Sequence, residues 1–199
     1  MKKILLALIS FVCVSISHAQ KTYIWCGTLI DGISNDAKKN MTIIVEKNKI
    51  IGVQNGFTAP GTSDKSIDLK SKTVTPGWID MHVHLEGETK KGNLADRFTL
   101  NPTDVAFESL KYANVTLMAG FTTVRDLGGS GVNISWRNAI NKGQVTGPRI
   151  YTAGKSIATT GGHADPTNGY RKDLMGDPGP KEGVVNGVED AYQAVRQRY

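Results

Sequence analysis

The chain has 199 residues, with 24 Lys and Arg against 18 Asp and Glu, and a formal net charge of +6. The basic residues are spread along the chain and form no stripe with interleaved aromatic side chains, so we do not expect nucleic acid as a partner. Only two cysteines, Cys13 and Cys26, are present. A zinc site built from four cysteines is therefore excluded, and any bound metal needs nitrogen or oxygen ligands.

Residues 1–19 are predicted to be a signal peptide. Lys2-Lys3 is a basic start, the stretch from Ile4 to Ile16 is mostly apolar, and small residues precede a cleavage point after Ala19. The apolar run is too short for a membrane-spanning helix. We expect cleavage, export to the periplasm or beyond, no stable membrane anchor afterwards, and Cys26 as the single remaining cysteine. The alternative is an uncleaved N-terminal anchor.

Residues 20–75 are predicted to form a small β domain. Short β segments alternate with turn residues, and Lys47-Asn48 suits a tight hairpin. The expected strands are Thr22–Ile30, Met41–Glu46, Lys49–Val53 and Ser66–Leu69. A generic β module fits this pattern nearly as well as any particular fold.

Residues 76–199 change to strand–helix alternation, which favours an α/β fold with a parallel sheet. After a first strand near Thr75–Leu85, we expect a helix from Asn101 and Pro102 to about Gly120, strands at Phe121–Leu127 and Arg149–Ala158, and helices over about Ile134–Lys142 and from near Gly187. No Gly-x-Gly-x-x-Gly follows the first strand, so a (β/α)₈ barrel is favoured over a dinucleotide-binding sheet.

The last expected helix still shows an apolar period at Tyr199 and has no stop signal. A complete barrel takes about 250 residues. We therefore expect an incomplete TIM barrel, namely the first three βα units and the start of the fourth helix region, within the N-terminal part of a longer protein.

The first strand of this region, Thr75–Leu85, contains two histidines two residues apart. Side chains at i and i+2 of a strand share a face, roughly 6.6 Å apart at Cα, so His82 and His84 can bind one metal ion at about 2.0–2.1 Å. Asp80 falls on the same face, whereas Ile79, Met81, Val83 and Leu85 form an apolar face expected to pack. A lone His-x-His pair is weak evidence, but this division of faces favours a metal site.

The segment Pro76–His84 resembles the first barrel strand of the amidohydrolase superfamily, whose members hydrolyse amide and ester bonds with one or two metals. Residues 120–128, 147–154, 160–166 and 188–196 are similar to the branch that contains imidazolonepropionase-like enzymes and Xaa-Pro dipeptidases. The resemblance implies that residues 20–75 are part of a small β-sandwich domain. One departure is Ala164, where related sequences commonly have Gly.

The resemblance also implies further ligands that this chain does not contain. Two-metal members add a carboxylated lysine from strand four, histidines from strands five and six, and an aspartate from strand eight that handles the proton of the attacking water. All of these would lie beyond Tyr199. We therefore expect Zn²⁺, as one or two ions or another divalent metal, and we expect the 199-residue chain alone to be inactive.

Four other residues are assigned weaker roles. Asp80 and Asp126 are expected to support the ligands, because an acid beside a metal-bound imidazole can orient its ring N–H. Arg125, at the end of the second strand, and His163, after the third, are expected on the substrate side. Arg125 and Asp126 can alternatively form a structural ion pair.

The sequence thus predicts metal-dependent hydrolysis of an amide bond in a small substrate, by resemblance a dipeptide that ends in proline or a basic residue. An imidazolonepropionase-like cyclic amidohydrolase and a mononuclear deaminase are alternatives, and a non-catalytic secreted binding module is an alternative of another class. A homo-oligomer is compatible with the sequence.

Overall fold

A computed structural model describes residues 19–198, so the predicted signal peptide lies almost wholly outside the described residues. The chain divides into two compact units, with the boundary between Pro76 and Gly77. Each unit has its own sheet and its own hydrophobic core. The chain is therefore a mixed α/β protein, as expected from the change in sequence pattern near residue 76.

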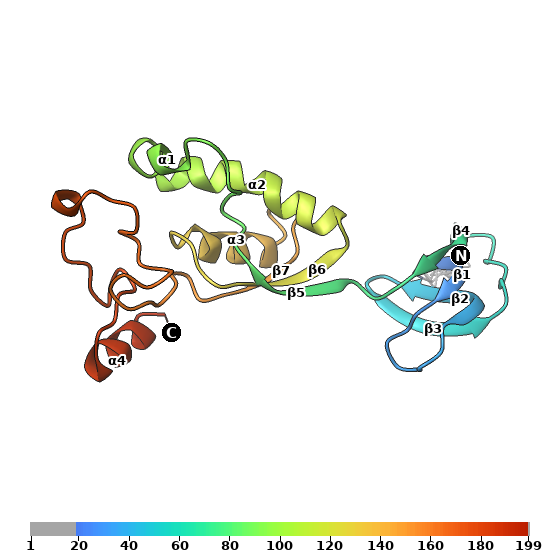
Figure 1. The fold of residues 1–199 in the computed structure, drawn as a ribbon. Helices are drawn as coiled ribbons and strands as arrows, with labels where there is room; N and C mark the ends of the chain where they lie inside the picture. Colours follow the sequence, from blue (N-terminus) through green and yellow to red (C-terminus); the bar gives the residue numbers. More distant parts are fainter. Residues whose placement is uncertain (1–18, 199) are drawn as a thin grey trace, which may run out of the picture. The chain divides into compact units, whose positions relative to one another are not determined.

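Unit 1 is built on one four-stranded sheet with the order β3-β2-β1-β4 (Figure 1). Its strands are β1 (Lys21–Leu29), β2 (Lys38–Glu46), β3 (Lys49–Asn55) and β4 (Lys65–Val74). Strand β2 pairs antiparallel with β1 and β3, whereas β4 pairs parallel with β1. The predicted hairpin at Lys47-Asn48 is confirmed, and Lys47 adopts a positive φ of 55° in that turn.

The core of unit 1 lies on one face of this sheet and explains the role of its cysteine. Cys26, Leu29, Met41 and Ile43 are buried together. Burial raises the pKa of the Cys26 thiol above its usual value, because the thiolate would lose its hydration. Cys26 is therefore an apolar core residue with little thiolate at neutral pH.

Gly27 lies at an irregularity where β1 passes very close to β4. A Cβ atom at this position would lie 1.9 Å from the backbone oxygen of Lys70. We predict that Gly27→Ala destabilises unit 1 by about 1–3 kcal/mol, because the two strands must separate. Urea denaturation followed by the indole N–H signal of Trp25 measures this. Gly52→Ala is the control, since its Cβ would meet only Ile44 at an ordinary 3.8 Å, and equal losses in both variants would contradict the prediction.

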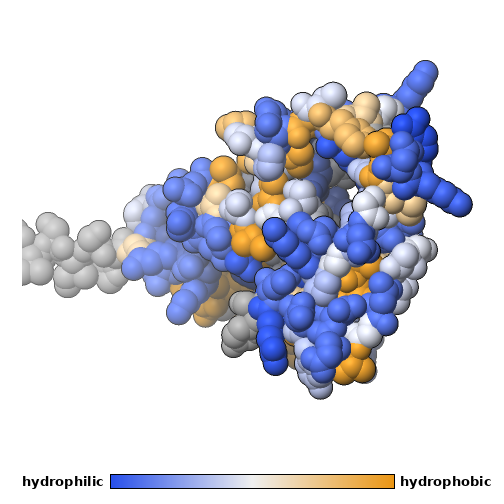
Figure 2. Space-filling view, turned by 90° about the vertical axis from the view of Figure 1, so that its left-hand side faces the viewer, coloured by the Kyte–Doolittle hydropathy of each residue, from blue (hydrophilic) through white to orange (hydrophobic). Residues whose placement is uncertain are grey.

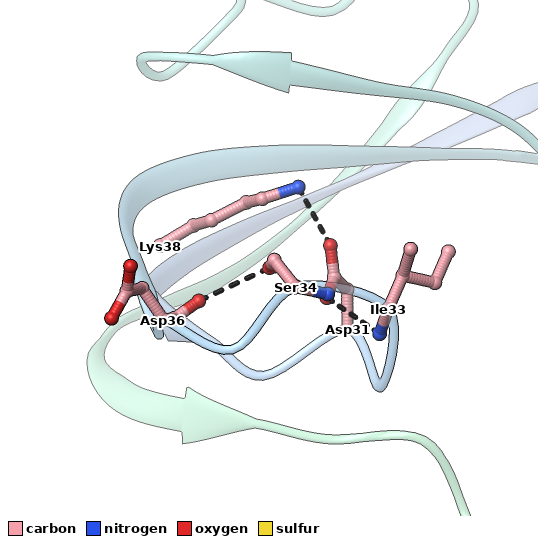
Figure 3. A network of polar contacts seen from close by, with 5 residues as sticks. All are labelled: Asp31, Ile33, Ser34, Asp36 and Lys38. Atoms are coloured by element: carbon pink, nitrogen blue, oxygen red, sulfur yellow. Dashed lines mark hydrogen bonds and ion pairs between the residues drawn. The ribbon is translucent and has the colours of Figure 1, made fainter.

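The β1–β2 connection is ordered by the side chain of Asp31 (Figure 3). One carboxylate oxygen accepts hydrogen bonds from the backbone N–H groups of Ile33 and Ser34, at 3.0 and 2.9 Å, and from the Ser34 hydroxyl. The other oxygen is paired with Lys38 at 2.6 Å. The Lys38 ammonium and these N–H groups hold the pKa of Asp31 well below its usual range. All of these contacts lie between Asp31 and Lys38, so we assign Asp31 a structural role in ordering this loop.

Unit 2 contains a three-stranded parallel sheet with the order β5-β6-β7. Its elements in chain order are β5 (Trp78–Val83), α1 (Asn93–Thr99), α2 (Pro102–Met118), β6 (Phe121–Asp126), α3 (Val132–Asn141), β7 (Arg149–Thr152), the 3₁₀ turn Lys172–Leu174 and α4 (Val188–Arg196). Helix α2 begins as predicted at Asn101-Pro102, where Asn101 and Asp104 form a capping box.

Helices α2 and α3 lie on one face of this sheet (Figure 1). The side chains of Val83, Leu85, Val124 and Ile150 pack beneath them around Trp136. Since side chains alternate along a strand, the neighbours of these residues point to the opposite face. His82, His84 and Arg125 are therefore on the face that α2 and α3 leave uncovered, and all three are exposed.

Several expectations about unit 2 need correction. The third strand ends at Thr152 rather than Ala158, because Gly154 adopts φ +76° and turns the chain. The last helix, by contrast, starts where it was expected, at Val188 after Gly187. The expected packing of Ile79 and Met81 is also wrong, since these side chains are 61% and 53% exposed on β5, an edge strand of the described sheet.

The surface of the described residues mixes polar and apolar groups. On the face drawn in Figure 2, hydrophilic residues cover much of the area and hydrophobic ones lie between them in small groups. Among residues 19–198, no helix combines the length and apolar character needed to cross a membrane.

Candidate metal and substrate site

The two histidines predicted to bind metal lie side by side at the end of β5. His82 is in the strand and His84 follows its last residue, Val83. Their ring centroids are 5.4 Å apart and the ring planes are inclined by 68°. Both rings are exposed on the uncovered face of the sheet. This spacing lets one nitrogen of each ring approach a common ion.

The ring of His84 is oriented by the backbone of the neighbouring strand end. Its Nδ1 lies 2.7 Å from the carbonyl oxygen of Gly128, which follows β6. A carbonyl oxygen only accepts hydrogen bonds, so Nδ1 must carry the proton. In a neutral ring this leaves the Nε2 lone pair free, which is the form in which imidazole binds metal.

Asp126 supports this arrangement from beneath the surface, where its side chain is 0% exposed. One carboxylate oxygen accepts the Leu85 backbone N–H at 3.0 Å. The other accepts the Gly128 backbone N–H at 3.0 Å and the Asn133 side-chain amide at 2.9 Å. Asp126 therefore fixes both the residue that follows His84 and the residue whose carbonyl holds the His84 ring.

Asp126 does not pair with Arg125, so the ion pair considered from the sequence is absent. The Nε of Arg125 instead donates to the Met81 carbonyl oxygen at 2.7 Å, across the gap between β6 and β5. This bond places the guanidinium next to the backbone of His82. Asp80 also bonds to the backbone, since its Oδ1 accepts the His82 N–H at 2.9 Å. Asp80 therefore holds the backbone at His82. It does not orient an imidazole N–H, as was expected from the sequence.

His163 is exposed on a loop after β7 that Asp165 organises. The Asp165 carboxylate accepts the Gly161 N–H at 2.8 Å and both the N–H and the hydroxyl of Thr167. These hydrogen bonds, first that from Gly161, hold the pKa of Asp165 below its usual value. The ionised Asp165 carboxylate therefore stabilises the loop at neutral pH. This stabilisation is lost only as the pH falls through the lowered pKa of Asp165.

Helix α1, which the sequence did not predict, connects this loop to the segment after β5. The Arg97 guanidinium donates to the Pro166 carbonyl oxygen at 3.0 Å, and the Phe98 and Tyr170 rings lie 5.6 Å apart. The segments that follow the histidine strand and the third strand are thus in contact. The hydrogen bonds of His163 lie within its own loop, where its carbonyl accepts from Asn168 at 3.4 Å.

The described residues include too few candidate ligands for a complete metal site. Between residues 19 and 198, no group of three or more His, Cys, Asp or Glu side chains is placed to hold a metal ion. The histidine pair nevertheless suits a zinc-type cation, because two imidazole rings lie side by side and Nδ1 of His84 is already hydrogen-bonded to the Gly128 carbonyl, which leaves its Nε2 for a metal. Two nitrogen ligands are fewer than the three that a catalytic zinc site usually has.

Sequence reasoning missed two polar residues of this region, Glu86 and Asn133. The Glu86 carboxylate accepts the backbone N–H groups of Ser130 and Asn133. The Asn133 side-chain amide bridges Asp126 and the carbonyl of Gly154, so it joins the ends of β6 and β7. Glu86 could have been found from the sequence, because it follows His84 by two residues. Nothing in the sequence distinguishes Asn133 from an ordinary polar residue on an exposed helix.

The parallel sheet, the α2 and α3 cover and the histidine pair at the strand end are compatible with a hydrolase, and the comparison with protein families agrees. The family model described as "Amidohydrolase family" matches residues 73–199. The chain belongs to the amidohydrolase family.

The chain is similar to several individual proteins. A solved structure titled as a Xaa-Pro dipeptidase with methionine bound in its active site is 46% identical, with a TM-score of 0.82 over 90% of this chain and 44% of that one. Ochratoxinase of Aspergillus niger is 26% identical over 93% of this chain and 41% of its own length. Imidazolonepropionase of Fusobacterium nucleatum subsp. nucleatum is 28% identical over 81% of this chain and 44% of its own. The chain therefore spans less than half the length of these relatives.

Proposed function

We propose that the whole protein is a metal-dependent hydrolase that cleaves the amide bond of a small substrate, most specifically a dipeptide ending in proline or a basic residue. The observation behind this proposal is the His82–His84 pair, in which the Gly128 carbonyl leaves the outer nitrogen of His84 free. The family match and the 46% identity to a Xaa-Pro dipeptidase support the reaction class and the substrate.

His82 and His84 would be the first two ligands of the metal. A divalent cation such as Zn²⁺, when bound, polarises a carbonyl and lowers the pKa of water towards about 7. The chain's contribution is to present two imidazole nitrogen donors side by side, with the His84 ring oriented by the Gly128 carbonyl. Asp126 and Asp80 would act on that orientation, since they bond to the backbone next to His84 and at His82 respectively.

Arg125 would bind the carboxylate of a dipeptide. Its Nε is used by the Met81 carbonyl, and no bond from its two terminal nitrogens to another described residue is found. Those nitrogens are exposed on the same face as the histidines, and guanidinium groups bind carboxylates well. His163 would approach the substrate from the β7 loop, which α1 ties to the segment after β5.

We also propose that unit 2 is the beginning of a (β/α)₈ barrel. The three parallel strands with helices on one face match the beginning of a (β/α)₈ barrel, whose catalytic groups lie at the carboxyl ends of the strands. The histidine pair, Arg125 and the His163 loop all lie at those ends. The catalytic base and further ligands would come from strands that the chain does not contain. We also propose export of the protein, as its first residues suggest.

The second candidate is an imidazolonepropionase-like cyclic amidohydrolase, favoured by the 28% identical relative from Fusobacterium nucleatum subsp. nucleatum. The two candidates differ in their products. A dipeptidase releases a free amino acid from a linear peptide, whereas a cyclic amidohydrolase opens a ring and releases none.

The test is to offer the zinc-loaded whole protein a panel of Xaa-Pro and Xaa-basic dipeptides, a cyclic amide and an aminopurine nucleoside. We predict release of free proline or a free basic amino acid from the dipeptides, loss of this activity with a chelator, and recovery with Zn²⁺. Ring opening or ammonia release without dipeptide cleavage would contradict the proposed substrate. Dipeptide cleavage that survives complete metal removal would contradict the proposed mechanism.

A further inference from the structure

Glu86 lies two residues after His84, and its carboxylate accepts two backbone hydrogen bonds. Its Oε2 accepts the backbone N–H of Ser130 at 2.7 Å, and its Oε1 accepts the backbone N–H of Asn133 at 3.2 Å. Both donors belong to the segment between β6 and the first turn of α3. A side chain from the end of β5 therefore holds the start of a helix that follows β6.

This contact adds to a weak local cap of α3, in which the Ser130 hydroxyl accepts the Val132 backbone N–H at 3.4 Å. The residue before the helix is Gly131, which has no side chain to bond the free N–H groups of the first turn. The Glu86 carboxylate supplies that acceptor from another part of the chain. Its negative charge also lies at the helix N-terminus, where the helix dipole stabilises it.

The loop is shaped to bring this carboxylate close. A Cβ atom on Gly129 would lie 2.4 Å from the Glu86 carboxylate, so a larger residue would displace it. A Cβ atom on Gly128 would lie 1.9 Å from the Ser156 hydroxyl, and Gly128 adopts φ +149°. The two glycines allow the loop to pass tightly between Glu86 and Ser156.

Gly128 is also the residue whose carbonyl accepts the His84 ring N–H. Its N–H is held by Asp126, the N–H of Gly129 is held by the Gly154 carbonyl, and the N–H of Ser130 is held by Glu86. We propose that Glu86 is a positioning residue for the metal site. By clamping the Gly128–Gly131 loop, it keeps the Gly128 carbonyl on Nδ1 of His84 and so keeps Nε2 available. The inference rests on the metal-binding role proposed for His84.

The experiment follows the protonation of the His84 ring directly, in metal-free chain labelled with ¹⁵N at histidine. Long-range ¹H–¹⁵N spectra distinguish a ring protonated at Nδ1 from one protonated at Nε2. We expect the unmodified chain to hold His84 in the Nδ1–H form. Glu86→Ala should convert it to a mixture of both forms and weaken Zn²⁺ binding by about 10-fold, in the range seen when outer partners of metal ligands are removed.

Asp104→Ala is the matched control, because it also removes a carboxylate from a helix start. The bonds of Asp104 join it to Asn101 within the α2 capping box, away from His84. This variant should keep the Nδ1–H form and the Zn²⁺ affinity. Glu86→Gln is the conservative variant, because it retains the shape of the side chain and one acceptor oxygen, and it should recover part of the Nδ1–H population.

The outcomes separate this inference from the proposed function. If Glu86→Ala or Glu86→Gln only lowers the stability of α3 and leaves the His84 ring in the Nδ1–H form, Glu86 is a helix cap and the inference is wrong. If the ring responds as expected but the whole protein binds no Zn²⁺, the positioning holds and the metal role of His84 fails.

Discussion

Replacing both His82 and His84 with alanine is expected to weaken zinc binding severely. The two rings lie 5.4 Å apart on one strand end, and together they supply the converging nitrogen donors of the proposed site. We expect the affinity for Zn²⁺ to fall by about 100-fold or more, because losing only a group that hydrogen-bonds to a metal ligand already costs about 10- to 100-fold. Equilibrium dialysis with zinc analysis measures the effect, and turnover by the whole protein should disappear with it.

His163→Ala is the control for this experiment. His163 is in the β7 loop, and its bonds connect it to that loop rather than to the histidine pair. The variant should bind Zn²⁺ like the unmodified chain. Equal zinc binding by the double variant and the unmodified chain would contradict the assignment. A loss in His163→Ala as large as in the double variant would place the ion elsewhere.

Removing the buried carboxylate of Asp126 is expected to have the second large effect, on the stability of unit 2. Three donors bond to this 0% exposed side chain, from Leu85, Gly128 and Asn133. Each buried donor left without a partner costs about 1–3 kcal/mol. Asp126→Ala should therefore lower the free energy of unfolding by about 3 kcal/mol or more. Urea denaturation followed by the indole N–H signal of Trp136, which is buried in the same unit, measures the change.

Asp80→Ala is the control for Asp126→Ala. It shows how much the free energy of unfolding falls when an acidic side chain near the histidines is lost. Asp80 is only partly buried and accepts a single backbone N–H, that of His82. We expect it to cost about 1 kcal/mol. If Asp126→Ala costs no more than Asp80→Ala, the three hydrogen bonds do not stabilise the strand ends and the description of Asp126 is wrong.

The histidine pair was predictable because strand alternation is a local property. Two residues apart on β5, His82 and His84 must share a face, and the neighbouring Val83 and Leu85 must share the other. The same local rules predicted the start of α2 at Asn101-Pro102 and the β2–β3 hairpin. Helix α1 was missed because its seven residues show too little periodicity to distinguish a helix from a loop.

The partners of the polar residues were not predictable, because they depend on contacts between distant segments. Asp126 was expected to support the ligands, but the sequence suggested Arg125 as its partner, and the two side chains point to opposite faces of β6. The acceptor that Arg125 uses is a backbone carbonyl 44 positions away. The exposure of Ile79 and Met81 likewise depends on what lies beside the edge strand β5, which alternation alone cannot indicate.

The most direct test of the metal assignment is a zinc titration of the ¹⁵N-histidine chain that reports each ring nitrogen. The structure predicts that Zn²⁺ shifts Nε2 of His84 and one nitrogen of His82 together, while the His84 Nδ1–H stays bonded to the Gly128 carbonyl. A shift at His163 without the pair, or loss of the Nδ1 proton of His84 on zinc binding, would contradict the account.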